Sequence, residues 1–183
     1  MHYQLKIQLT NADFLAFNYF HSLESTIGKK QFKQARTVFA VVMAVIVALV
    51  LLISGWSTFS ALFTVLIGLF SVLFLLFLKK IAKLNIRAQI NTLKKSGKLP
   101  FEPEANYDFY EDCFIIRTEN MCSEDSYATL ERIDVVENQY AFLYNSSMSA
   151  HVLPIAQIRD QVNQEAFLQF LSTKCGTMET HSR

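Results

Sequence analysis

The sequence has no charge in a long stretch of its first half. No Asp, Glu, Lys, Arg or His lies between Val38 and Leu78, and no acidic residue lies between Ser25 and Phe101. Ionisable side chains within a membrane mark ion pathways, proton relays and charged-substrate sites. Their absence argues against transport by this chain alone and against a charge-lined pore.

Groups that carry chemistry are also scarce. The chain has no glycine-rich phosphate loop, no nucleophile elbow and no His-x-x-x-His pair. Its four histidines are scattered, at His2, His21, His151 and His181. The adjacent acids Glu111-Asp112 and Glu124-Asp125 each fall where we expect a solvated turn. The sequence therefore predicts no catalytic residue, no cofactor and no enzymatic activity.

Cysteine is too rare for a disulfide framework. Cys113, Cys122 and Cys175 all follow the uncharged stretch, in a part that we expect to lie in a reducing compartment. Their spacing is not that of a zinc site, and no histidine lies close enough in sequence to complete one. We expect buried or half-buried thiols and no metal.

What the uncharged stretch does contain is two apolar runs. Helices over residues 37–54 and 61–78 would each span about 27 Å at roughly 1.5 Å per residue, close to the ~30 Å of a bilayer core. A buried hairpin in a soluble protein is the alternative, but a core helix usually has a polar face and both runs lack one. A signal peptide is disfavoured because the first run begins only at Val38, after a patterned segment.

Basic residues flank both outer ends of this hairpin, and the short loop over residues 54–60 has none. By the positive-inside rule, both termini face the cytoplasm and the chain is a multi-pass protein of the inner (cytoplasmic) membrane. The basic residues are expected to contact anionic lipid headgroups at the cytoplasmic leaflet. They are Lys29, Lys30, Lys33, Arg36, Lys79, Lys80, Lys83 and Arg87. No aromatic platform accompanies them, so nucleic acid is not expected as a partner.

Small residues recur every four positions in both runs. Backbones of membrane helices approach closely where such residues meet, so we predict that the two ridges pack on each other within the chain. The alternative is that one ridge mediates homodimerisation. The predicted helix-packing residues are Ala40, Ala44 and Ala48 on the first helix and Ser60, Thr64 and Gly68 on the second.

The segment before the hairpin, residues 1–36, is predicted to be a cytoplasmic strand and amphipathic helix, and the apolar stripe of this helix should pack on the C-terminal domain or on the membrane surface. Residues 2–9 alternate between apolar and polar side chains, which predicts a half-buried strand. Thr10 and Asp13 have capping-box spacing, so a helix should follow to about Ser25. Gly28 is expected to loosen the chain before the first membrane helix.

After the hairpin, residues 79–99 predict a basic juxtamembrane helix that ends at Gly97. Residues 100–176 then change to short β segments and turns, with polar residues 120–126 as a loop. Asn163 can cap a last helix over residues 164–173, and residues 177–183 are expected to be disordered. The fold class predicted is an α+β membrane protein, with a two-helix transmembrane hairpin and an antiparallel β domain closed by a C-terminal helix.

This order of parts resembles the YcxB-like family of small bacterial membrane proteins. The motifs that carry the resemblance are Leu9-Thr10-Asn11-Ala12-Asp13, Tyr127-Ala128-Thr129-Leu130-Glu131-Arg132-Ile133, Val136-Glu137, Ala141-Phe142-Leu143-Tyr144, Leu153-Pro154 and Phe167-Leu168-Gln169-Phe170-Leu171. In this family the position of Tyr127 is often Trp. The resemblance implies a half-barrel of the pleckstrin-homology kind and supplies no catalytic residue.

Two functions of different classes fit these features. From Phe101 onward there are 14 acidic residues and five basic ones, a net charge near −9. Such a domain, held at an anionic leaflet, would be repelled by phosphoinositides and could instead bind a basic protein partner. The alternative is a bacteriocin or toxin immunity protein, or an accessory protein, that acts through its hairpin. An enzyme ranks third.

Overall fold

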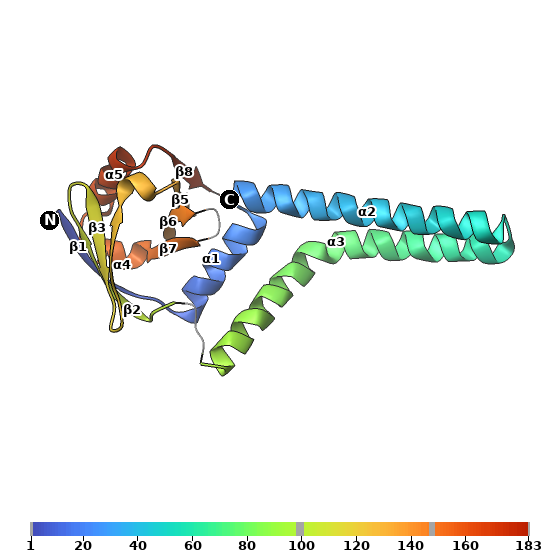
Figure 1. Cartoon of the computed structure of the whole chain (residues 1–183), viewed down its shortest axis with the longest axis horizontal. Coiled ribbons are helices and arrows are strands. Elements are labelled where there is room, and N and C mark those ends of the chain that lie inside the picture. Colours follow the sequence, from blue (N-terminus) through green and yellow to red (C-terminus); the bar gives the residue numbers. More distant parts are fainter. Residues whose placement is uncertain (1, 98–100, 147–148, 183) are drawn as a thin grey trace. The chain divides into compact units, whose positions relative to one another are not determined.

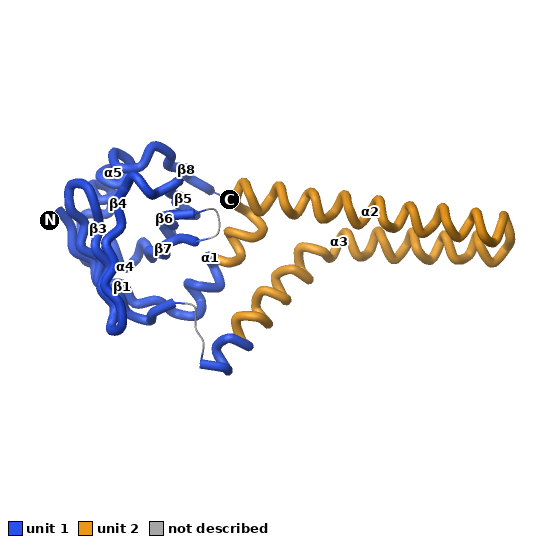
Figure 2. Tube along the Cα trace, in the orientation of Figure 1, with its two compact units in different colours: residues 1–17, 92–183 blue, residues 18–91 orange. Residues whose placement is uncertain are grey.

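The computed structural model describes residues 2–97, 101–146 and 149–182. The chain divides into two compact units (Figure 2). One unit comprises Met1–Phe17 together with Thr92–Arg183, and the other comprises Asn18–Asn91. Residues 1–17 therefore belong to the same unit as the C-terminal domain, and the predicted N-terminal part over residues 1–36 is divided between the two units.

Two long helices, α2 (Thr26–Ser54) and α3 (Thr58–Lys95), run antiparallel in the second unit (Figure 1). Both are long and apolar enough to cross a membrane, and none of the residues in their apolar windows is buried. A core helix of a soluble protein would have most of that surface buried, so this reading is disfavoured. The basic segment after residue 78 is the continuation of α3, without a break before Lys95.

Gly28 does not loosen the chain but lies buried in the first turn of α2. The Ser25 hydroxyl caps this helix by accepting a hydrogen bond from the Gly28 N–H at 3.0 Å. A Cβ on Gly28 would lie 2.3 Å from the His21 carbonyl oxygen, in the preceding helix α1 (Asn11–Leu23). Glycine is needed here because the two helices join at a tight corner.

The first sheet of the other unit has the antiparallel order β1-β2-β3-β4. Its strands are β1 (Tyr3–Gln8), β2 (Glu104–Phe109), β3 (Cys113–Arg117) and β4 (Cys122–Ser126). Strand β1 precedes the hairpin and pairs along its whole length with β2, which follows it. Strand β4 occupies much of the predicted loop, so Glu124-Asp125 lies in a strand and not in a turn.

The second sheet has the order β7-β6-β5-β8. Its strands are β5 (Arg132–Val136), β6 (Tyr140–Ser146), β7 (Ser149–Pro154) and β8 (Met178–His181), and the one-turn helix η1 (Tyr127–Thr129) precedes it. The prediction of disorder over residues 177–183 is wrong at β8, which pairs in parallel with β5. Hydrogen bonding to a distant strand orders a segment that has no strong local preference of its own.

The core lies where side chains of both sheets meet those of two short helices. Helix α4 (Ile155–Arg159) contributes Ile155 and Ile158, and helix α5 (Gln164–Lys174) contributes Phe167 and Leu171. Asn163 caps α5 as predicted, by accepting a hydrogen bond from the Ala166 N–H at 3.0 Å. The α+β class is confirmed, and within the described residues the two sheets do not close into a barrel.

The first turns of α1 cover the other face of the second sheet. Phe17 packs against Phe142 and Tyr144 of β6, with ring centroids 5.3 and 6.0 Å apart. The predicted capping box is present: the Asp13 carboxylate accepts the Thr10 N–H at 2.8 Å. Because both faces of β6 are covered, its residues 141–144 are all buried.

Candidate functional site

The predicted helix-packing residues divide between the inside and the outside of the hairpin. Ser60 is buried and Thr64 half-buried on α3, but Gly68 is exposed and a Cβ there would meet nothing within 4 Å. All three alanines of the α2 ridge, Ala40, Ala44 and Ala48, are exposed. Within this chain, the predicted contact between two small-residue ridges is therefore wrong.

Large side chains take the place of the alanines between the helices. The half-buried positions of α2 include Phe39, Met43 and Val47, each one residue before an alanine of the ridge. Phe39 stacks on Phe74 of α3, with centroids 4.5 Å apart. The predicted contact residues of α2 thus have the observed spacing of four positions but lie on the wrong face of the helix. Apolar residues occupy every face of a helix in this stretch, so periodicity cannot show which face packs on α3.

The basic residues predicted to contact lipid are mostly exposed: Lys29, Lys30, Lys33, Arg36, Lys79, Lys80 and Arg87. Lys83 is half-buried, and its Nζ lies 5.5 Å from the centroid of the Tyr19 ring. The Nζ of Lys79 lies 3.6 Å from a Glu24 carboxylate oxygen. Most of these cations are thus available to an anionic surface.

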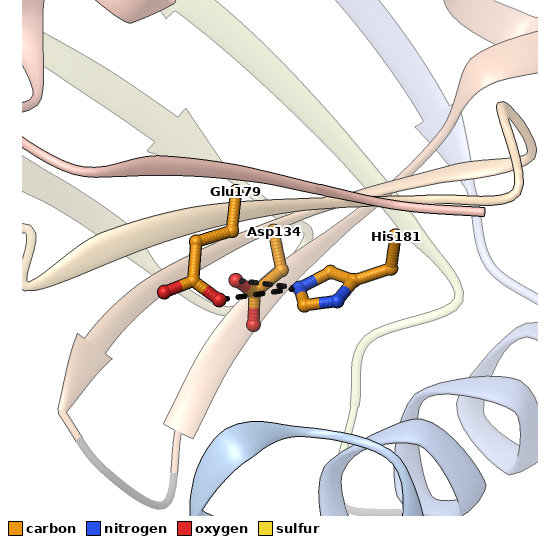
Figure 3. A group of neighbouring side chains, drawn as sticks. All are labelled: Asp134, Glu179 and His181. Atoms are coloured by element: carbon orange, nitrogen blue, oxygen red, sulfur yellow. Dashed lines mark hydrogen bonds and ion pairs between the residues drawn. The ribbon is translucent and has the colours of Figure 1, made fainter.

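A polar cluster missed by the sequence analysis lies on the second sheet. Parallel pairing of β5 with β8 places Asp134 beside Glu179, and His181 follows two residues later on the same face (Figure 3). The Nε2 atom of His181 lies 3.4 Å from Oδ1 of Asp134 and 3.5 Å from Oε2 of Glu179. One potential ligand atom from each residue lies within 4.8 Å of the other two, an arrangement that could hold a metal ion.

Arg132 supports this cluster from within β5. Its Nε donates a hydrogen bond of 3.1 Å to Oδ2 of Asp134, and its guanidinium lies 4.0 Å from the centroid of the Tyr144 ring. Burial, together with the charge of Asp134, raises the pKa of Tyr144 to about 12, so this phenol stays neutral. Asp134 is 2% exposed, so its polar atoms depend on these partners for hydrogen bonds.

A second polar group lines a cavity of about 350 Å³ on the same unit. His151 of β7 reaches this cavity, and its Nε2 lies 3.4 Å from Oδ2 of Asp125 on β4. Burial lowers the pKa of His151, and the Asp125 carboxylate opposes that shift. The rest of the lining is largely apolar, with Phe14, Phe17 and Tyr107 among it.

Neither polar group was visible in the sequence, because each joins residues from strands that are far apart along the chain. Comparison with known protein families, curated proteins and solved structures finds no match for this chain. The chain by itself defines an α+β protein with two helices that are long and apolar enough to cross a membrane.

Proposed function

We propose that this protein spans the inner membrane twice and presents its acidic α+β domain at the cytoplasmic surface for protein interaction, without enzymatic activity. The observation that carries the two-span arrangement is the pairing of β1 with β2. These strands lie on opposite sides of the hairpin in sequence and hydrogen-bond to each other in one sheet. The two strands must therefore lie in the same compartment. This requires that the chain between them cross the membrane an even number of times.

The choice of compartment follows from charge. Basic residues flank both outer ends of the hairpin, the loop between the helices has none, and positive residues favour the cytoplasmic side. A reporter fused after Arg183 should therefore be cytoplasmic, and a reporter inserted beside Trp56 should be exported. Matching positions for the two reporters would contradict the two-span arrangement, and a reversed pair would contradict its orientation.

We also propose that the domain is a half-barrel of the pleckstrin-homology kind, as the YcxB-like resemblance implies. The arrangement of its strands and of α5 supports this proposal. Four strands form one sheet, three consecutive antiparallel strands form most of the other, and Phe167 and Leu171 of α5 are fully buried in the core. The insertion of the hairpin between β1 and β2 distinguishes this arrangement from a simple C-terminal domain after an anchor.

We propose a basic protein as the partner of this domain. Residues 101–183 of this domain carry a net charge near −9, which includes the exposed carboxylates of Glu119, Glu124 and Glu131. Charge complementarity of this kind raises the rate of association and is weakened by salt.

Capture of a partner by the full chain in membranes should fall at high salt and when all three residues are replaced by Gln. The control replaces the exposed basic residues Lys80 and Arg87 by Gln, and an equal loss with it would argue against the acidic surface.

A second function is favoured by the exposure of the alanine ridge. Because Ala40, Ala44 and Ala48 are not used inside the hairpin, they remain available to a helix of another membrane protein or to a second copy. This would suit an immunity or accessory protein. Ala44→Leu should then abolish partner capture by the full chain, whereas Val45→Leu should retain it. Capture that survives Ala44→Leu would exclude this function.

A further inference from the structure

We propose that Asp134, Glu179 and His181 bind one divalent cation of the zinc class. This inference concerns the α+β unit alone and does not depend on the proposed membrane function. The three side chains supply two carboxylate oxygens and one imidazole nitrogen, and both donor types bind zinc in proteins. They come from two adjacent, paired strands, so the sheet fixes their spacing.

The distances are compatible with a shared ion as well as with long hydrogen bonds. Charge-assisted hydrogen bonds between an imidazolium and a carboxylate are about 2.7–2.9 Å long. The two contacts of His181 Nε2, at 3.4 and 3.5 Å, are longer than this. Two tetrahedral ligands with bonds of about 2.0–2.2 Å to one zinc ion lie about 3.3–3.6 Å apart. The observed separations therefore leave room for an ion between the atoms.

The surroundings orient the ligands as metal sites require. Residues that hydrogen-bond to a ligand fix its direction. Arg132 donates a hydrogen bond to Oδ2 of Asp134. The other oxygen of that carboxylate, Oδ1, lies toward His181 (Figure 3). Exposure rises from 2% at Asp134 to 24% at His181 and 44% at Glu179, so the cluster is anchored on one side and open to solvent on the other. This opening provides a path for the ion and space for a water ligand.

The donor types determine which cation fits. Imidazole nitrogen suits zinc and other transition metals, whereas calcium and magnesium prefer sites built only of oxygen. The two carboxylates balance the charge of a divalent ion. Arg132 adds a positive charge next to Asp134, and this limits the affinity without removing a ligand. Zinc should therefore bind, and magnesium and calcium should not compete at equal concentration.

The test uses the untagged full chain in detergent, titrated with Zn²⁺ against a chelating indicator. One ion should bind per chain. His181→Ala and Glu179→Gln should each lower the affinity for Zn²⁺ by at least about 10–100-fold, which is the effect of losing a residue that only orients a ligand. Glu179 is exposed enough for its variant to fold, which circular dichroism checks. Control variants His2→Ala, Glu165→Gln and Cys122→Ser lie outside the cluster and should keep the affinity.

Two further measurements separate a metal site from an ion-pair network. Co²⁺ should give the visible absorption of a tetrahedral site, and this absorption should disappear in His181→Ala. Zn²⁺ should also slow amide hydrogen exchange in β8, because a bound ion would tie β8 to β5. Absence of stoichiometric binding, or unchanged affinity in both ligand variants, would overturn the proposal and leave the cluster as an ion-pair network.

Discussion

His151 is a histidine whose protonation is affected by burial. Its ring lies edge-on to Phe114 and Tyr107, with centroids 5.5 and 6.2 Å away. Burial lowers its pKa below the ordinary value of 6.5, and the nearby Asp125 carboxylate offsets part of that effect. The folded protein thus holds this imidazole neutral at pH values where the unfolded chain protonates it.

This lowered pKa predicts a loss of stability in acid. Since the unfolded state binds more protons between the folded pKa and about 6.5, the stabilisation is complete above 6.5 and is lost as the pH falls through that window. His151→Gln should flatten the decline of the unfolding temperature between pH 7 and pH 5. Asp125→Asn should steepen it, because the group that raises the pKa is removed. Calorimetry of the full chain in detergent measures both, and identical slopes in all three proteins would contradict the prediction.

Two glycines with opposite surroundings give a matched pair of substitutions. At Gly28 a Cβ would lie 2.3 Å from the His21 carbonyl oxygen and 2.7 Å from the Ser22 carbonyl carbon, both of them backbone atoms. Gly28→Ala should therefore cost about 1–3 kcal/mol, as overpacking does. At Gly68 the space is open, so Gly68→Ala should change stability by less than about 1 kcal/mol. Thermal unfolding in detergent compares them, and equal effects would show that the corner between α1 and α2 is not tight.

At the scale of elements, α4 and the turn that follows it protect the β1 edge of the first sheet. Gln161 accepts the Lys6 N–H at 2.7 Å and donates to the Lys6 carbonyl at 2.8 Å. Gln157 makes the same pair of contacts with Gln8, both at 2.8 Å. Two side-chain amides, one helical turn apart, thus take the place of a neighbouring strand and block pairing with another chain.

Removing these amides should uncover the edge of β1. The double change Gln157→Ala and Gln161→Ala deletes four hydrogen bonds to β1, but water can replace them at an exposed edge, so the expected cost is about 1–3 kcal/mol. Hydrogen exchange at the Lys6 and Gln8 amides should accelerate. Gln169→Ala, on the exposed side of α5, is the control and should leave both amides protected. Unchanged exchange in the double variant would mean that α4 does not protect this edge.

At the scale of the whole molecule, the α+β unit is discontinuous in sequence. Leu5 and Ile7 of β1 are fully buried in its core, although more than 90 residues separate them from their partners on β2. A fragment that begins at Phe101 therefore lacks one of four strands in the first sheet. The hairpin can be regarded as a long insertion in the β1–β2 connection.

This organisation predicts which fragments fold. Residues 1–17 joined by a flexible Gly/Ser linker to residues 92–183 should unfold cooperatively in solution. Residues 101–183 alone should not, because Leu or Ile removed from a core costs about 2–5 kcal/mol each and β2 also loses its hydrogen bonds. Dispersion of amide signals in NMR spectra distinguishes the two.

Leu5→Ala in the linked chain should cost a similar 2–5 kcal/mol. A well-folded 101–183 fragment would contradict the role assigned to β1.

Local chemistry in the sequence determined the apolar hairpin, the alternation of β1, the capping box at Thr10 and the cap at Asn163. Each depends on residues within a few positions of one another, so its pattern is complete in a short window. The sequence also determined that charge is confined to the ends of the hairpin and to what lies beyond them.

Tertiary structure decided everything that depends on partners distant in sequence. Only pairing with β2 places β1 in the C-terminal domain, and only pairing with β5 orders β8 and brings Glu179 and His181 to Asp134. The face of α2 that packs on α3 was likewise decided by Phe39 and Phe74, and not by the alanine ridge. The physical reason is the same in each case: a strand edge or an apolar face has many possible partners, and the packing of the whole chain selects one of them.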